Sequence, residues 1–173
     1  MNNKIIQGKV HKFGDNINTD FINPAQYMEL SMEEMVKHAM EGANPNFSKN
    51  VKKGDILVAG INFGSGSSRE TAPMVIKESG VSVIIAKSFA RIFYRNAINI
   101  GLRVLVCPET DEISEGDELE IDLNLGLIRN LSNNKTHNCD KLPDNILEMV
   151  NDGGLIEHLL KIRYVKEKDK ILN

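Results

Sequence analysis

The chain has 173 residues, which is enough for one domain with a substantial hydrophobic core. Its formal net charge is −3, from 21 basic and 24 acidic residues, so the strongly basic surface of a nucleic-acid-binding protein is excluded. No apolar run reaches the length of a membrane span. The first residues, Met-Asn-Asn-Lys, lack the apolar core of a secretory leader, so we expect a cytoplasmic protein without nucleic-acid or membrane partners.

The first third of the chain predicts a strand, a polar loop and a helix. Residues 7–13 alternate weakly between apolar and polar side chains, as a half-buried strand does. Residues 14–20 are polar and rich in turn formers, which favours a loop. Ser31, followed three residues later by Glu34, matches a capping box and predicts a helix that runs to about residue 41.

The middle of the chain alternates between strand and helix patterns. Strands are predicted at residues 56–59, 81–86 and 103–107, and helices at residues 71–79 and 88–100 between them. This β-α-β-α-β order favours parallel pairing of the three strands, because each crossover helix returns the chain to the same end of the sheet.

The last third of the chain has a different pattern. Residues 118–123 alternate strictly and predict a half-buried strand, with a partner strand at residues 127–131 after a turn. Short helices are predicted at residues 145–150 and 155–160, and the charged residues 161–173 are expected to fray. We therefore predict one α/β domain over residues 1–173, with a mixed sheet and flanking helices.

The loop between the first central strand and its helix carries the most chemistry. Residues 60–70 read Gly-Ile-Asn-Phe-Gly-Ser-Gly-Ser-Ser-Arg-Glu. Flexible glycines at this point let backbone N–H groups converge on an anion at the positive end of the helix. Ser67, Ser68 and Arg69 add two hydroxyls and a guanidinium, so the loop could bind a carboxylate or phosphate and activate a hydroxyl.

The same loop residues could instead cap the following helix or belong to another known motif. Ser67 and Glu70 match a capping box, and we favour that role for Glu70. Capping needs one serine, however, and explains neither Arg69 nor the glycines before it. Three known motifs do not match this loop. The phosphate-binding Walker A loop would need a lysine after Gly66, and the dinucleotide-binding fingerprint would need a third glycine at the position of Arg69. The nucleophile elbow of the α/β-hydrolases would need a glycine at the position of Glu70.

The two cysteines give little support for a metal centre. Cys107 lies in an apolar strand pattern, and Cys139 lies in a polar stretch near His137 and Asp140. That trio could hold a metal ion, but a closed structural site usually has four ligands, so we predict no metal ligands in this chain. Two cysteines cannot by themselves ligate an iron–sulfur cluster.

Three separated blocks together resemble the swivel domain of the aconitase superfamily. They are the glycine-rich loop, Asn18-Thr19-Asp20 followed by Pro24-Ala25 and Tyr27, and residues 86–99, which read Ala-Lys-Ser-Phe-Ala-Arg-Ile-Phe-Tyr-Arg-Asn-Ala-Ile-Asn. The chain length and the late Gly153-Gly154 are similar to the free-standing form, the small subunit of 3-isopropylmalate dehydratase and its close relatives. The resemblance spans nearly the whole chain and implies a β/β/α swivel domain with a barrel-like mixed sheet.

The resemblance also implies roles for individual residues. In this family the small subunit closes over a large subunit that carries a [4Fe–4S] cluster, so we expect a large-subunit partner and no cofactor bound by this chain. Ser67 corresponds to the catalytic base, Arg69 to a residue that acts in catalysis and binding, and Asp20 to a member of the active-site hydrogen-bond network. The substrate-binding set is then Ser68, Arg69, Gly64 and Gly66.

These residue types suit a dehydration next to a carboxylate. Serine is a poor base unless its alkoxide is stabilised, and loop N–H groups, a helix N-terminus and a guanidinium can stabilise it. Arg69 can also bind a carboxylate with two parallel hydrogen bonds, which would fix the carbon that loses its proton. Departures from the family pattern are Ser65, where the family often has cysteine, and Thr71, where it often has histidine.

The segment after Asn18-Thr19-Asp20 bears on substrate choice in this family, where an arginine accompanies substrates with an extra carboxylate. Here the specificity loop reads Tyr27-Met28-Glu29-Leu30, and no Arg or Lys occurs in residues 21–36. Met28 and Leu30 could instead line an apolar pocket or pack as ordinary loop residues. We therefore expect alkyl-substituted malates to be preferred. Arg91 and Arg95, in the third block, are interpreted as structural or interface residues.

The sequence thus predicts the small subunit of a heteromeric hydro-lyase, with 3-isopropylmalate dehydratase of leucine biosynthesis as first choice and a small dicarboxylate as substrate. Related alternatives are 2,3-dimethylmalate dehydratase and homoaconitase. A non-catalytic anion-binding module is a rival from another class. A serine hydrolase would need a base from His11, His38, His137 or His158, none of which lies in a recognisable motif. The isolated chain could form a homo-oligomer.

Overall fold

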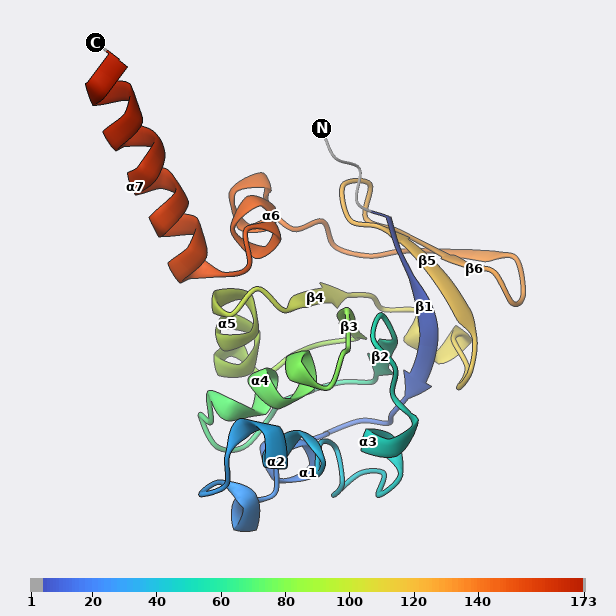
Figure 1. The fold of residues 1–173 in the computed structure, drawn as a ribbon. Helices are drawn as coiled ribbons and strands as arrows, with labels where there is room; N and C mark the ends of the chain where they lie inside the picture. Colours follow the sequence, from blue (N-terminus) through green and yellow to red (C-terminus); the bar gives the residue numbers. More distant parts are fainter. Residues whose placement is uncertain (1–4, 173) are drawn as a thin grey trace.

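The structure, a computed structural model, describes the backbone of residues 5–172 and the side chains of residues 5–164. Within this range seven strands form one mixed sheet in the order β4-β3-β2-β1-β5-β6-β7, which curls into a half-barrel (Figure 1). The strands are β1 Ile5–Lys12, β2 Ile56–Ala59, β3 Val83–Ala86, β4 Arg103–Val106, β5 Glu118–Asp122, β6 Leu127–Asn130 and β7 Lys135–Asn138. The α-helices are α1 Thr19–Ile22, α2 Met32–Val36, α3 Phe47–Asn50, α4 Thr71–Glu78, α5 Arg91–Asn99, α6 Asp144–Asn151 and α7 Leu155–Leu172, with 3₁₀ turns at Ala25–Tyr27 and Thr110–Glu112.

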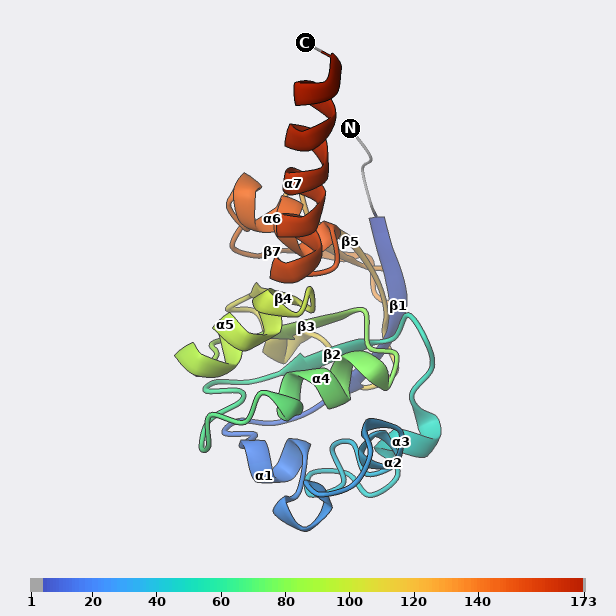
Figure 2. The same ribbon diagram turned by 60° about the vertical axis from the view of Figure 1, so that its left-hand side comes forward.

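The parallel half of the sheet confirms the predicted β-α-β-α-β order. Ile56 of β2 pairs with Val83 of β3, and Val83 pairs with Arg103 of β4, all in parallel register. Every residue of β2 and β3 is buried, as is typical of parallel strands that are covered on both faces. Figure 2 shows α4 and α5 lying together beside these strands. β1 extends the parallel half through the pair Val10 and Ile56.

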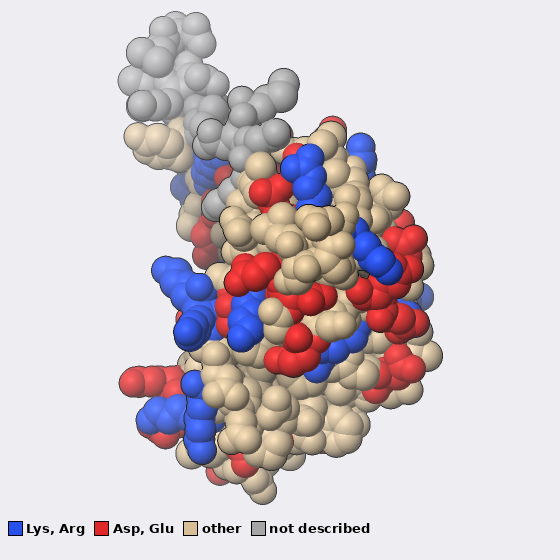
Figure 3. Space-filling view, turned by 90° about the vertical axis from the view of Figure 1, so that its right-hand side faces the viewer, with Lys and Arg blue, Asp and Glu red and all other residues tan. Residues whose placement is uncertain are grey.

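The antiparallel half begins where β5 pairs with β1, with Ile5 opposite Asp122. The strict alternation of β5 places Leu119 and Ile121 in the core, and the predicted hairpin with β6 is confirmed. β7 was not predicted, since only His137 of its four residues is buried and the strand therefore has no apolar period. The side of the molecule that carries these strands shows acidic and basic side chains interspersed (Figure 3).

Three predicted helices differ clearly in length from the observed ones. The helix predicted at residues 88–100 begins only at Arg91 and ends at Asn99 as α5. Ser31 caps α2 as predicted, its Oγ accepting a hydrogen bond from Glu34 N at 3.3 Å, but α2 ends at Val36 and turns follow. α7 runs beyond the predicted end at residue 160 and projects from the body of the protein (Figures 1 and 2). That residues 161–173 fray remains a prediction, and the side chains of residues 165–173 lie outside the described residues. None of the described helices is both long enough and apolar enough to cross a bilayer.

Candidate active site

The glycine-rich loop, residues 60–70, lies between the two other blocks that carry the family resemblance. On one side, Gly64 N donates to Ile17 O at 2.7 Å and Thr19 N donates to Ser65 O at 2.8 Å. On the other side, Ala90 N donates to Phe63 O at 2.9 Å. The tertiary structure therefore brings three segments that are far apart in the sequence into one backbone hydrogen-bond network.

Two glycines of the loop are required by its geometry. Gly64 has φ of +79°, and a Cβ at this position would lie 2.1 Å from Cγ of Phe93. Gly66 has φ of +99°, with Thr19 Oγ1 only 3.1 Å from the place of a Cβ. Both positive φ values and both close approaches exclude larger residues without movement of the loop. Gly64 is buried, and the lack of a side chain lets the loop pack against Phe93, whereas Gly66 is exposed and its backbone is accessible to a ligand.

The capping box predicted for Ser67 and Glu70 is wrong. α4 begins at Thr71, so Glu70 itself occupies the N-cap position, and its side chain makes no capping hydrogen bond. Ser67 is held differently, because its backbone N–H donates to Thr19 Oγ1 at 3.1 Å. Ser67 and Ser68 are both exposed, and neither hydroxyl hydrogen-bonds to another described residue. Both hydroxyls are therefore available to a ligand.

Arg69 is held in place by the segment that contains Asp20. Its Nη1 donates to Asp20 Oδ1 at 2.7 Å and to the Asn23 carbonyl oxygen at 3.1 Å. The Arg69 side chain is only 14% exposed, whereas that of Asp20 is 62% exposed. Within the described chain, Nε and Nη2 of Arg69 donate no hydrogen bond, which leaves one edge of the guanidinium for a carboxylate. Asn18 caps α1 by accepting from Phe21 N at 3.0 Å, which positions Asp20.

Thr19 and Asn23 support this arrangement and were assigned no role from the sequence. Thr19 is 1% exposed and anchors Ser67, and Asn23 is fully buried. Asn23 Nδ2 donates to Thr71 Oγ1 at 3.0 Å, so Thr71, a departure from the family pattern, joins α1 to the start of α4. The sequence signal for Thr19 was its place inside the Asn-Thr-Asp block. No signal marked Asn23, because a buried asparagine is recognisable only from its contacts.

The predicted specificity loop lies after α1, and one residue anchors it. Tyr27 stacks on His38 with ring centroids 3.7 Å apart, and its hydroxyl donates to Glu41 Oε1 at 3.2 Å. Met28 and Leu30 are 41% and 42% exposed, and Glu29 is exposed as well. None of these four residues hydrogen-bonds to the glycine-rich loop in the described chain. They therefore do not close the site from within this chain.

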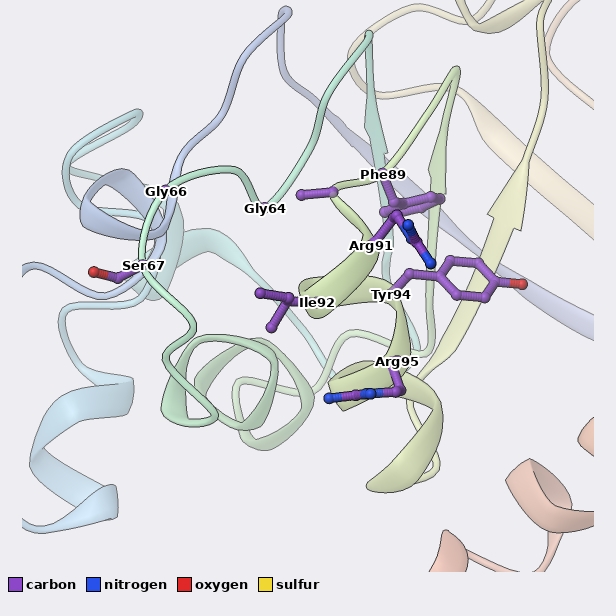
Figure 4. A pocket seen from close by; sticks show the side chains of 9 residues that line it. Gly64, Gly66, Ser67, Phe89, Arg91, Ile92, Tyr94 and Arg95 are labelled. Carbon is purple, nitrogen blue, oxygen red and sulfur yellow. The ribbon is translucent and has the colours of Figure 1, made fainter.

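A cleft of about 780 Å³ adjoins the loop on the side of α5 (Figure 4). Gly64, Gly66 and Ser67 form one wall, and the other is lined by Phe89, Ala90, Arg91, Ile92, Tyr94 and Arg95. In Figure 4 the Ser67 side chain points away from α5, and Ile92 lies between it and the two arginines. Arg69 does not line this cleft. The cleft is thus lined by Ser67 and the two glycines of the candidate site but not by Arg69.

The cysteines and histidines are engaged elsewhere. Burial raises the pKa of the Cys107 thiol and raises that of Cys139 to about 12, so neither is an activated thiolate. The described residues contain no group of three or more His, Cys, Asp or Glu side chains that could hold a metal ion, and they do not fit an iron–sulfur cluster. Each of the four histidines hydrogen-bonds to an acidic residue, and in the described chain none hydrogen-bonds to Ser67 or Ser68, as the base of a serine hydrolase would.

Comparisons with known proteins identify the family of the chain. The model of the aconitase C-terminal domain family matches residues 2–110. The chain is 51% identical over 158 residues to the 3-isopropylmalate dehydratase small subunit of Methanosarcina mazei, covering 91% of this chain and 98% of the relative. It is 52% identical to the methanogen homoaconitase small subunit of Methanothermobacter thermautotrophicus, covering 91% and 92% of the two chains.

A solved structure, that of 3-isopropylmalate dehydratase (LeuD) from Methanocaldococcus jannaschii, has the same fold. It superposes with a TM-score of 0.92 at 47% identity, covering 96% of this chain and 99% of the other. A match over this share of the chain extends over both the parallel and the antiparallel halves of the sheet. On the family model, the identity and the shared fold, the chain belongs to the aconitase C-terminal domain family.

Proposed function

We propose that this chain is the small subunit of a heteromeric iron–sulfur hydro-lyase, 3-isopropylmalate dehydratase, which interconverts 2- and 3-isopropylmalate in leucine biosynthesis. The observation that carries the proposal is the unused edge of Arg69, held by Asp20 beside two serine hydroxyls without partners in the described chain. Relatives that share half of their residues with this chain carry that name. The enzyme would work in the cytoplasm.

This chain's part in the reaction is substrate binding and proton transfer. Arg69 would bind a substrate carboxylate through Nε and Nη2, and Ser68 would add a hydroxyl. Ser67 would remove the proton from the carbon next to that carboxylate, as water is eliminated, and return it during rehydration. Gly64 and Gly66 line the cleft beside Ser67, and the exposed backbone of Gly66 can approach the substrate closely because this residue has no side chain. The large subunit would bring the [4Fe–4S] cluster, which supplies the Lewis acid for the leaving hydroxyl.

The first test separates this two-subunit enzyme from a self-sufficient one. The chain purified alone under anaerobic conditions is expected to be colourless, to contain no iron or sulfide, and to have no hydratase activity. Activity should appear when the reconstituted large subunit is added. Iron and sulfide analysis and turnover of isopropylmalate are the measurements.

A stoichiometric cluster on the isolated chain, or turnover without the partner, would overturn the proposal. Binding of dicarboxylates without turnover in the presence of the partner would favour an anion-binding module.

Homoaconitase is the second candidate, because a homoaconitase small subunit is 52% identical to this chain. The segment from residue 21 to residue 36 contains no cation, and a buried carboxylate without a cationic partner is costly. We therefore expect alkyl-substituted malates, isopropylmalate and 2,3-dimethylmalate, to be preferred over homoaconitate.

Glu29→Arg is expected to raise the ratio of kcat/KM for homoaconitate to that for isopropylmalate by about tenfold, equivalent to about 1.4 kcal/mol. Glu29 is exposed, so the substitution should not disturb the fold. The control is Glu78→Arg, which makes the same charge change at an exposed residue at the end of α4, outside residues 21–36. A native preference for homoaconitate would contradict the argument and would place the missing cation on the large subunit.

A further inference from the structure

Helix α5 carries two arginines that the described chain leaves without partners. Arg91 is the first residue of α5, and Arg95 follows one turn later. Both side chains are exposed, and neither forms an ion pair or a hydrogen bond with another described residue. The helix reads Arg-Ile-Phe-Tyr-Arg-Asn-Ala-Ile-Asn and has no acidic residue that could compensate them.

This placement is electrostatically unfavourable for the isolated chain. Like charges four residues apart on a helix repel each other. Arg91 also stands at the positive end of the helix dipole, where an acidic residue would be favoured. The fold does not require either guanidinium, because both lie at the surface. An anion supplied from outside the chain would remove both costs.

The surroundings of the arginines have the composition of a protein interface. Ile92, between them, is 48% exposed, and Phe89 and Tyr94 are partly exposed in the same cleft. Arg95 also borders a second hollow of about 330 Å³ between α5 and α6, which Pro143, Ile146 and Met149 line with apolar surface. Arginine and aromatic side chains around exposed apolar residues are typical of the centre of an interface.

We propose that this surface, defined by Phe89, Arg91, Ile92, Tyr94 and Arg95, is the docking site for the cluster-bearing large subunit. The proposal rests on the proposed function. The partner would present a segment with two carboxylates for the arginines and an apolar side chain for the cleft. The glycine-rich loop forms the opposite wall of the cleft, so a body seated there also reaches the candidate active site.

The geometry favours a protein partner over the substrate as occupant. Arg69 and Asp20, which would hold the substrate, do not line the cleft, and Ser67 points away from α5. A single small dicarboxylate bound at Arg69 would therefore leave Arg91 and Arg95 unsatisfied. The large subunit must approach this loop in any case, because it carries the cluster that acts on the same substrate.

The test compares two double charge reversals. Arg91→Glu/Arg95→Glu should weaken binding to the reconstituted large subunit by at least about tenfold, since close charge pairs across interfaces contribute about 1.5 kcal/mol or more. The control, Lys49→Glu/Lys53→Glu, makes the same change in net charge on exposed residues at the α3 side of the molecule. It should bind as the wild type does. The measurements are the subunit Kd at low and high salt, and kcat and KM at saturating large subunit.

The outcomes separate the docking proposal from the proposed function. Support requires a raised Kd for the α5 variant alone, a weaker salt dependence of its binding, and near-normal kcat and KM once the large subunit is saturating. An unchanged Kd, an equal loss in both variants, or a raised KM with unchanged Kd would overturn the docking proposal and leave the function standing. If the wild-type chain neither binds the large subunit nor turns over substrate, both proposals fail.

Discussion

Replacing Ser67 with alanine is expected to lower kcat of the reconstituted enzyme by about 10²–10⁴-fold, the usual contribution of a general base, with little change in KM. The Ser67 hydroxyl hydrogen-bonds to no other described residue, and the backbone N–H holds the residue to Thr19. Alanine therefore removes the proton acceptor and leaves the anchor of the loop intact. Steady-state kinetics with isopropylmalate and wild-type large subunit measure the effect.

Two other serines of the same loop serve as controls for this result. Ser65→Ala should leave kcat close to normal, because the hydrogen bond of Ser65 to Thr19 uses the backbone carbonyl. Ser68→Ala should raise KM more than it lowers kcat, as expected for a residue that only binds the carboxylate. Near-normal turnover of Ser67→Ala would show that another group removes the proton and that the role assigned to Ser67 is wrong.

The second large effect is expected at Arg69. Arg69→Lys should raise KM by about 10- to 100-fold and also lower kcat, because a hydrogen bond to a charged group contributes about 1.5–3 kcal/mol. An ammonium cannot bind Asp20, the Asn23 carbonyl and a substrate carboxylate in the fixed geometry of a guanidinium. The measurements are kcat and KM, together with the affinity of a non-reacting dicarboxylate.

Asp20 provides an independent check on the same site. Asp20→Asn keeps the size of the side chain but removes the charge that holds Arg69 at 2.7 Å. We expect a smaller loss than for Arg69→Lys, because the Asn23 carbonyl still binds Nη1. Arg129→Lys, at an exposed residue of β6 that also pairs with an acidic residue, is the matched control and should have no effect on kinetics. An unchanged KM for Arg69→Lys would mean that the substrate carboxylate binds elsewhere.

Much of the fold could be predicted because its patterns are local. The apolar runs of β2, β3 and β4 and the amphipathic α5 follow from the side chains that a buried strand or a one-sided helix needs. The alternation of β5 likewise shows in its own five residues. β7 could not be predicted, because its pairing with β6 relies on backbone hydrogen bonds rather than on buried apolar side chains.

The sequence alone determined the family, through three motif blocks in a fixed order, and from them the residues with candidate roles. Only the tertiary structure decided what those residues contact. Ser67 and Glu70 match a capping box in the sequence, but the bond from Ser67 N to Thr19 Oγ1 draws the loop toward α1, and α4 begins later. The orientation of Arg69, the anchoring by Asn23 and the exposure of Arg91 and Arg95 arise from contacts between distant segments. Such contacts leave no periodic trace in the sequence, because the energy of each depends on a partner that the chain brings near only on folding.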